Sequence, residues 1–239
     1  MQNITTQQGE IRKEDEQATT DVTLEQQQRA ASSRTLLESF LPDADIVIND
    51  EIVVMATPEV TYSALKSVDF TQSRSLLLRA VLALRVAETR RARRKLGFAP
   101  LPARARVSLE NVEDYGHIRL AEKEGVEIAI GEIMRPMSAA SLFEGRTAAE
   151  FKAFDCPGYI KAVGGFVVMP YGEKRTLLLY EARIRATDTP TRRQLVLWNT
   201  LTMPLVALLT TQKLAHVKRA AERQCAAPGY RQAISAQAV

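Results

Sequence analysis

The chain has 239 residues, of which 46% are hydrophobic and 25% charged, and it carries a formal net charge of +4. These values are ordinary for a globular protein and exclude a collagen-like or wholly disordered chain. The two cysteines, Cys156 and Cys225, lie far apart and in no CxxC pattern, which argues against a disulfide framework or a zinc site. Because the polar start of the sequence also lacks the apolar core of a signal peptide, we expect a reduced, cytoplasmic protein.

The two ends of the chain differ in composition from its middle. Residues 1–42 are rich in glutamine, and such a segment buries too little apolar surface to offset the entropy of ordering it. We therefore predict a disordered polar tail over 1–42 and a flexible tail over 225–239. Residues 43–224 have the length of one domain.

The first predicted elements are a strand and two helices. Residues 43–57 alternate and are rich in Ile and Val, which predicts a strand. A helix then begins at Pro58, a favourable first residue, with Thr57 as its cap. A longer helix is predicted over 73–97, where Gly97 is a natural stop.

From Tyr115 onward the hydrophobic period changes to two, which is typical of strands. Two hairpins, one turning at Glu124-Gly125 and the other in the sequence YGEK, flank a short helix in TAAEFKAFD. A last helix of about 30 residues follows Asp188, and Pro204 kinks it without ending it. Because the strands are grouped together and the helices are separate from them, this order predicts an α+β fold.

The last helix could be a membrane span or a core helix. Residues 194–212 carry no charge and approach the length of a span, but they include Asn199, Pro204 and several threonines. A lipid-facing span is apolar on all sides, so we predict an amphipathic core helix. Its buried side is expected to consist of Leu195, Trp198, Leu201, Leu205 and Leu208.

Several stretches of the sequence resemble one known superfamily. The segment IVVMATPEVTYSAL is similar to its first strand and small helix, and GEIMRP, FKAFDCPGYIKA and TLLLYEARIRATDTPTRRQL are similar to an uncharacterised bacterial branch of it. From residue 43 to 223 the chain thus resembles the START-like proteins, also called helix-grip or SRPBCC, which include polyketide cyclase/dehydrase-like members. The resemblance implies a curved antiparallel sheet that grips a long C-terminal helix around a hydrophobic cavity. It implies no catalytic set, because members vary widely in activity.

Strand alternation indicates which side chains could contact a ligand. In 126–135, Ile130 and Met134 share a face with Glu132, and this apolar face is expected to lie against the last helix. Glu181, Arg183 and Arg185 are expected on the opposite face, in a solvated ladder of charges. The predicted ligand-binding residues are Ile130, Met134, Phe166, Tyr180, Trp198 and Leu205.

Glu132 is the candidate catalytic residue, because a carboxylate in an apolar pocket has a raised pKa and can act as an acid or base. The alternatives are that it lies near a strand end, lies at a bulge, or pairs with an arginine, since pairing is the usual arrangement for a buried charge. His117 opens a strand and His216 lies in the last helix, and neither belongs to a catalytic motif. The pair Gly164-Gly165 is predicted to form a bend or bulge.

Three functions are compatible with these patterns. The first is a binding module for a hydrophobic small molecule or lipid, and the second a cofactor-independent cyclase, dehydratase or isomerase for a hydrophobic, polyketide-like substrate. The third is a partner-binding protein with a filled core. The sequence shows no motif for a metal or cofactor, so neither is expected.

The insert at 73–106 is strongly basic, with ten Lys and Arg residues against one acidic residue, Glu88. It could be a helix with a solvated arginine face or one paired with the acidic N-terminal tail. A basic amphipathic helix could also contact an anionic membrane. The residues expected to do so are Arg90, Arg91, Arg93, Arg94 and Lys95. Nucleic acid is not expected as a partner, because no aromatic residues are interleaved for base stacking.

Overall fold

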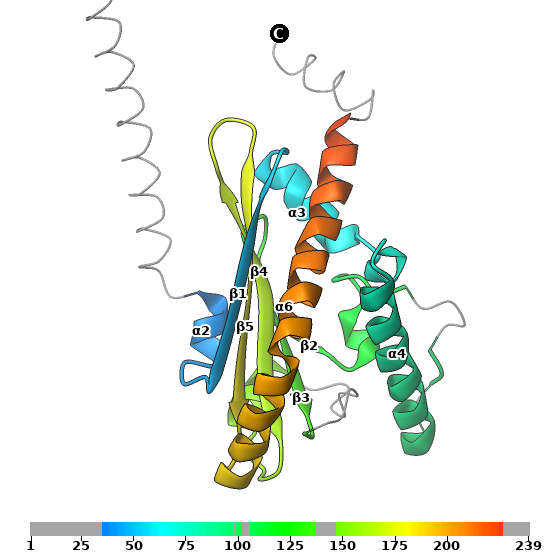
Figure 1. Cartoon of the computed structure of the whole chain (residues 1–239), viewed down its shortest axis with the longest axis vertical. Coiled ribbons are helices and arrows are strands. Elements are labelled where there is room, and N and C mark those ends of the chain that lie inside the picture. Colours follow the sequence, from blue (N-terminus) through cyan, green and yellow to red (C-terminus); the bar gives the residue numbers. More distant parts are fainter. Residues whose placement is uncertain (1–34, 98, 102–105, 137–146, 227–239) are drawn as a thin grey trace, which may run out of the picture. The chain divides into compact units, whose positions relative to one another are not determined.

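The computed structural model describes residues 35–97, 99–101, 106–136 and 147–226. Most of the two predicted tails lies outside these residues, as does part of the basic insert. The described residues from Leu36 onward form a five-stranded sheet with helices on both faces (Figure 1).

The sheet is antiparallel throughout, with the strand order β1-β5-β4-β3-β2. Its strands are β1 (Ile46–Val54), β2 (Ile118–Lys123), β3 (Glu127–Met134), β4 (Ile160–Pro170) and β5 (Thr176–Ala186). The first strand thus pairs with the last, and Ile46 lies opposite Ile184. Gly125 and Gly172, both with φ of 77°, turn the hairpins β2–β3 and β4–β5 in a conformation that glycine adopts without strain. Both predicted hairpins are confirmed.

Local residues explain where the helices begin and end. The helices are α2 (Leu36–Phe40), α3 (Pro58–Ser67), α4 (Leu76–Leu96), α5 (Ala148–Ala153) and α6 (Thr189–Ala226). Ser75 caps α4 by accepting a hydrogen bond of 3.2 Å from the backbone N–H of Leu78. Gly97 ends α4 with a left-handed φ of 77°, as the sequence predicts.

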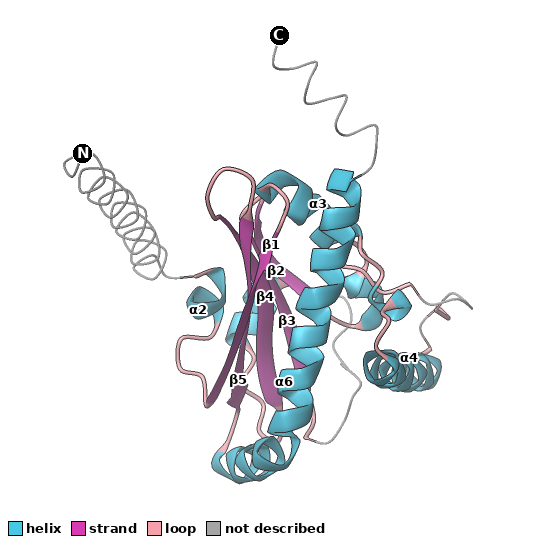
Figure 2. Cartoon of the chain, turned by 45° about the horizontal axis from the view of Figure 1, so that its top comes forward, coloured by secondary structure: helices cyan, strands magenta, loops and turns pink. Residues whose placement is uncertain are grey.

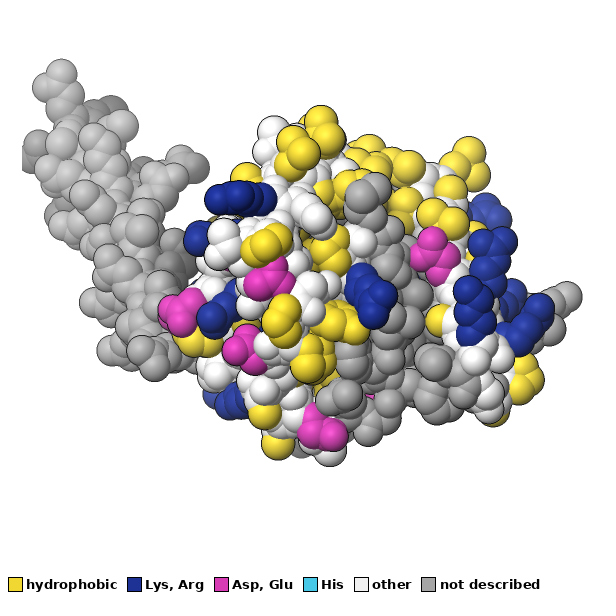
Figure 3. All heavy atoms as spheres, turned by 90° about the horizontal axis from the view of Figure 1, so that it is seen from below, with side chains coloured by type: hydrophobic (Ala, Val, Ile, Leu, Met, Phe, Trp, Pro, Cys, Tyr) yellow, Lys and Arg dark blue, Asp and Glu magenta, His cyan; other side chains and the backbone are white. Residues whose placement is uncertain are grey.

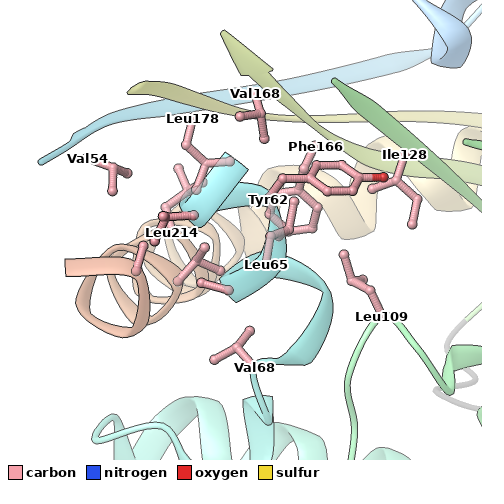
Figure 4. Packing of buried hydrophobic residues seen from close by; sticks show 14 of the residues in the cluster. Val54, Tyr62, Leu65, Val68, Leu109, Ile128, Phe166, Val168, Leu178 and Leu214 are labelled. Atoms are coloured by element: carbon pink, nitrogen blue, oxygen red, sulfur yellow. The ribbon is translucent and has the colours of Figure 1, made fainter. Parts of the chain in front are cut away.

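The long helix α6 crosses the inner face of the sheet, and its C-terminal half also packs on α3 (Figure 2). Its side chains Leu214 and Val217 enter a core with Leu65, Phe166 and Leu178 (Figure 4). An antiparallel sheet that holds a long C-terminal helix is the arrangement of a helix-grip fold. The predicted α+β class and the resemblance to this fold are therefore confirmed.

The outer face of the sheet is covered, which corrects two predictions. Leu37 and Leu41, which the sequence assigns to the polar tail, are buried with Phe151 against this face, so the packed part of the chain includes residues 36–41. The charges predicted to form a solvated ladder are partly enclosed as well. Arg183 Nε donates to the carbonyl oxygen of Leu41 at 2.8 Å, and its side chain is only 15% exposed. Apolar residues of α2 and α5 cover the outer face of the sheet. The alternation of side chains within one strand does not reveal such a cover.

The middle of α6 corrects a further prediction. Among the residues predicted to form its buried side, only Leu195 is buried, whereas Leu201 is 72% exposed. The positions that face the sheet over this stretch include Asn199 and Thr202, both half-buried. In the described part of the chain, α6 is the one helix long and apolar enough to cross a membrane, and 11% of its apolar window is buried. The prediction of a core helix is thus wrong for residues 196–208.

The glycine pair in β4 forms neither a bend nor a bulge, because β4 keeps an unbroken register with both neighbouring strands. Gly165 lies on the outer face, where a Cβ atom would approach the carbonyl oxygen of Ile128 to 2.3 Å. Gly164 lies on the inner face, where a Cβ atom would meet the Tyr180 hydroxyl at an ordinary 3.4 Å. Gly165 thus permits close packing on the outer face of the sheet, and Gly164 leaves space between the inner face and the helices.

Candidate functional site

A cavity of about 340 Å³ lies between the inner face of the sheet and the helices α4 and α6. Alternating strand residues form its floor, and small residues leave room in it. The floor residues are Ile48, Ile130, Glu132, Met134, Ala162, Gly164, Phe166, Tyr180, Ala182 and Ile184. The helices contribute Leu78, Leu82, Arg85, Val206 and Lys213. The lining is therefore mainly apolar with a few polar groups, which is typical of small-molecule sites.

Three polar side chains meet at one part of the cavity wall. Glu132 of β3 forms an ion pair with Arg85 of α4. His117, which precedes β2, places its Nε2 3.9 Å from Glu132 Oε2, too far for a hydrogen bond. The other ring nitrogen of His117, Nδ1, is buried and has no hydrogen-bond partner among the described residues. The His117 ring thus lines the cavity beside the Glu132–Arg85 pair, and Nε2 is its nitrogen near the carboxylate.

Lys213 of α6 adds a further positive charge to the lining. Its Nζ lies 5.1 Å from the centre of the Tyr180 ring, in a cation–π contact. Within the described residues, Lys213 has no carboxylate partner. With Glu132 already paired to Arg85, the cavity wall carries an excess of positive charge.

Burial lowers the pKa of His117, and the nearby Arg85 lowers it further, whereas the carboxylate of Glu132 acts in the opposite direction. Because the ordinary pKa of histidine is 6.5, the His117 ring is neutral at pH 7. A neutral imidazole has one nitrogen that donates and one that accepts. His117 is thus suited to exchange a proton with a bound molecule.

The lowered pKa of His117 predicts how stability depends on pH. The unfolded chain takes up a proton near pH 6.5, before the folded chain does, so the free energy of unfolding should fall as the pH drops from 7.5 through 6.5. It should level off below the folded-state pKa. His216, whose pKa burial also lowers, acts in the same direction. Urea titrations at pH 7.5 and 6 should show a smaller loss for His117→Gln than for the natural protein, and an equal loss would contradict this account.

The structure brings together most of the predicted site residues. Glu132, Ile130, Met134, Phe166 and Tyr180 all line the cavity. The pairing of Glu132 with Arg85 is one of the alternatives that its sequence context left open. Trp198 and Leu205 do not line the cavity, because the side of α6 that carries them is exposed, by 46% and 40%.

Sequence reasoning missed Arg85, His117 and Lys213 as cavity residues. Arg85 follows Leu78 and Leu82 at helical spacing, so the pattern of α4 could have indicated that it shares their inward side. Nothing in the local sequence marks Lys213, which faces inward because α6 packs on β1 and β5.

A second cavity, of about 590 Å³, lies near the end of α6 and has a different character. It is lined mostly by polar side chains, among them Arg74, Arg106, Arg219 and Arg223. No group of three His, Cys, Asp or Glu side chains in the described part of the chain could hold a metal ion. The cavity between sheet and helices is therefore the candidate site for an apolar ligand.

Comparison with known proteins gives similarity of structure alone. No protein-family profile matches the chain, and no curated protein matches it in sequence. A conserved protein of Geobacillus kaustophilus is 11% identical, with a TM-score of 0.36 over 74% of this chain and 96% of its own. A hypothetical protein of Helicobacter pylori is 10% identical, with a TM-score of 0.35 over 79% and 95%. The Zhui aromatase/cyclase from Streptomyces sp. R1128 is 11% identical, with a TM-score of 0.30 over 77% and 97%.

Proposed function

We propose that the protein binds a small, largely apolar molecule that carries one anionic or hydrogen-bond-accepting group. The observation that carries this proposal is the composition of the cavity wall, in which an apolar floor is combined with an excess of positive charge. The apolar body of the ligand would contact Ile130, Phe166 and Ile184. Its polar group would lie near Lys213, whose ammonium contacts only the Tyr180 ring among the described residues. A charge-assisted hydrogen bond there would fix the orientation of the ligand.

Two fluorescent probes of nearly the same shape test the proposal. 1-Anilinonaphthalene-8-sulfonate carries one sulfonate, and N-phenyl-1-naphthylamine is the same ring system without it. We expect both to bind, the sulfonate more tightly. Lys213→Gln should weaken binding of the sulfonate about tenfold, because a hydrogen bond to a charged group is lost, and leave the neutral probe unaffected.

The control substitution closes the cavity without touching its charges. Ala162→Phe places a large ring on the cavity floor, beside Glu132 and Ile184 in the sheet register, and should abolish binding of both probes. Leu201→Gln, on the exposed side of α6, should change neither affinity and serves as the check against surface binding. If Ala162→Phe bound both probes as the natural protein does, the cavity would not be the binding site.

A second candidate function is acid–base catalysis without a cofactor, as in a cyclase, dehydratase or isomerase. The observation that favours it is the neutral His117 beside the Glu132–Arg85 ion pair at the cavity wall. His117 would take the proton and Glu132 would stabilise the resulting imidazolium by charge. Organic extracts of gently purified protein would supply the compound, which is then incubated with the protein in D2O. Deuterium incorporation or water loss that disappears in His117→Gln would support catalysis, and no change with the natural protein would leave binding as the function.

A further inference from the structure

Two helices expose large apolar side chains that no described part of the chain covers. On α6 these are Leu197, Leu201, Leu205 and Leu208, and on α4 they are Leu76 and Leu84. We refer to these six residues as the leucine face. In Figure 3 hydrophobic side chains gather along the upper edge of the view, over the part of the molecule that α6 and α4 occupy. Contiguous apolar surface of this kind is rare on monomeric soluble proteins and marks an interaction site.

The exposure of these leucines follows from the orientation of α6 about its own axis. Over residues 196–208 the helix turns Asn199 and Thr202 toward the sheet, whereas its leucines point away. An amphipathic helix that packs only on its own sheet would have the opposite orientation. The leucine face of α6 is therefore built for contact with something outside the domain.

The exposed side of α4 changes from apolar to basic along its length. Leu77, Ala80 and Leu84 are exposed in its first half, and Arg91, Arg94 and Lys95 continue the same exposed side in its second half. Glu88 is the one acidic residue in this helix. In Figure 3 one group of Lys and Arg side chains lies at the right end of the view, next to the apolar edge, and others lie at the left and in the centre.

We infer that the leucine face docks on the surface of an anionic lipid bilayer. The leucines would enter the boundary between headgroups and acyl chains, and the basic half of α4 would lie against the headgroups. A bilayer fits better than a second copy of this chain, because a copy would present the same excess of positive charge. Anionic headgroups neutralise that excess.

The same geometry indicates a helix that lies on the bilayer and does not cross it. One side of α6 faces the sheet and lines the cavity through Val206 and Lys213, so only the opposite side is open to lipid. A spanning helix needs apolar contact on all sides. Because α4 and α6 both line the cavity, docking would bring the cavity next to the bilayer. The docking itself does not depend on what the cavity holds.

The test is co-sedimentation of the full chain with vesicles of phosphatidylcholine, with and without phosphatidylglycerol. We expect binding to the anionic vesicles that weakens as salt is added, because exposed charges are screened. Leu197→Gln with Leu201→Gln should lower the partition coefficient at least tenfold through lost apolar burial. Arg91→Gln, Arg94→Gln and Lys95→Gln together should lower it about 100-fold, since each basic residue contributes about a factor of five.

Matched controls change the same residue types elsewhere on the surface. Met55→Gln removes an exposed apolar side chain outside the leucine face; the backbone N–H of Met55 donates to Glu222, near the C-terminal end of α6. Lys123→Gln with Lys174→Gln removes two exposed charges. These variants should bind the vesicles as the natural protein does. Ala162→Phe should also bind them normally, although it loses the cavity probes, so failure of docking and failure of ligand binding are distinguishable.

Three results would overturn the inference. The first is the absence of binding to anionic vesicles. The second is binding that the leucine variant leaves unchanged. The third is light scattering that shows a stable dimer of the natural protein and a monomer of Leu201→Gln, since the leucine face would then be covered by a second copy of the chain.

Discussion

Gly165→Ala should destabilise the domain by about 3 kcal/mol, the upper end of the usual cost of overpacking a well-packed site. A Cβ atom at this position would lie 2.3 Å from the carbonyl oxygen of Ile128 and 2.7 Å from Leu37 Cδ1. The first of these atoms belongs to the backbone of β3, which is hydrogen-bonded along the whole strand and cannot move aside. Urea denaturation followed by circular dichroism would measure the loss.

Gly164→Ala is the matched control, one residue away on the same strand. Its Cβ atom would point into the cavity and meet the Tyr180 hydroxyl at 3.4 Å. Alanine also lowers the entropy of the unfolded chain, so this variant should be within about 1 kcal/mol of the natural protein. The double variant Gly165→Ala/Leu37→Ala should not recover stability, because the clash with the Ile128 carbonyl oxygen remains. Equal stability of the two alanine variants would show that β3 and β4 are further apart than the structure places them.

Breaking the Arg85–Glu132 ion pair should cause the second-largest loss of stability. The loss should depend on which of the two residues is replaced. Removing Arg85, as in Arg85→Met, leaves the carboxylate of Glu132, which is 11% exposed, without its partner. Removing Glu132, as in Glu132→Gln, leaves Arg85, which is 32% exposed and can reach water. Breaking a buried pair costs about 3–5 kcal/mol, and the partial exposure of Arg85 reduces this to about 2–3 kcal/mol for Arg85→Met and to less for Glu132→Gln.

A double-mutant cycle would measure the coupling of this pair. Arg85→Met/Glu132→Gln should cost less than the sum of the single changes, because neither charge is left unpaired. Glu124→Gln is the exposed control: its carboxylate lies 3.4 Å from Lys66 Nζ but is 75% exposed, so its loss should cost less than about 0.5 kcal/mol. Additive single changes would mean that the pair does not form in solution.

The strand faces were predictable because a strand has a fixed side-chain period. Alternation alone places Ile130, Glu132 and Met134 on one side, and all three line the cavity. The end of α4 was predictable for a similar local reason, since Gly97 is a favourable residue for a helix stop, whereas the helix begins after Ser75 and not at the predicted residue 73. These elements follow from interactions within a few residues of sequence.

The orientation of α6 was not predictable in the same way. Apolar residues occupy several sides of this helix between Leu195 and Leu208, so its period does not select one buried side. Its orientation is set by distant contacts, such as the hydrogen bond of 2.8 Å that Thr211 donates to Asp50 of β1. The local sequence around Glu132 does not reveal its partner either, because Arg85 lies 47 residues earlier in the chain.

The pairing of β1 with β5 also has a consequence for how the chain is made. Ile46 pairs with Ile184 and Val54 with Thr176, so β1 leaves the ribosome long before its partner strand exists. At about 5–20 residues per second, this delay is on the order of ten seconds. During that time β1 is an unpaired strand rich in Ile and Val, which other nascent chains could join. Its centre, Asn49-Asp50-Glu51, places polar and charged groups where such joining would begin, and gatekeeper residues of this kind suppress aggregation during synthesis.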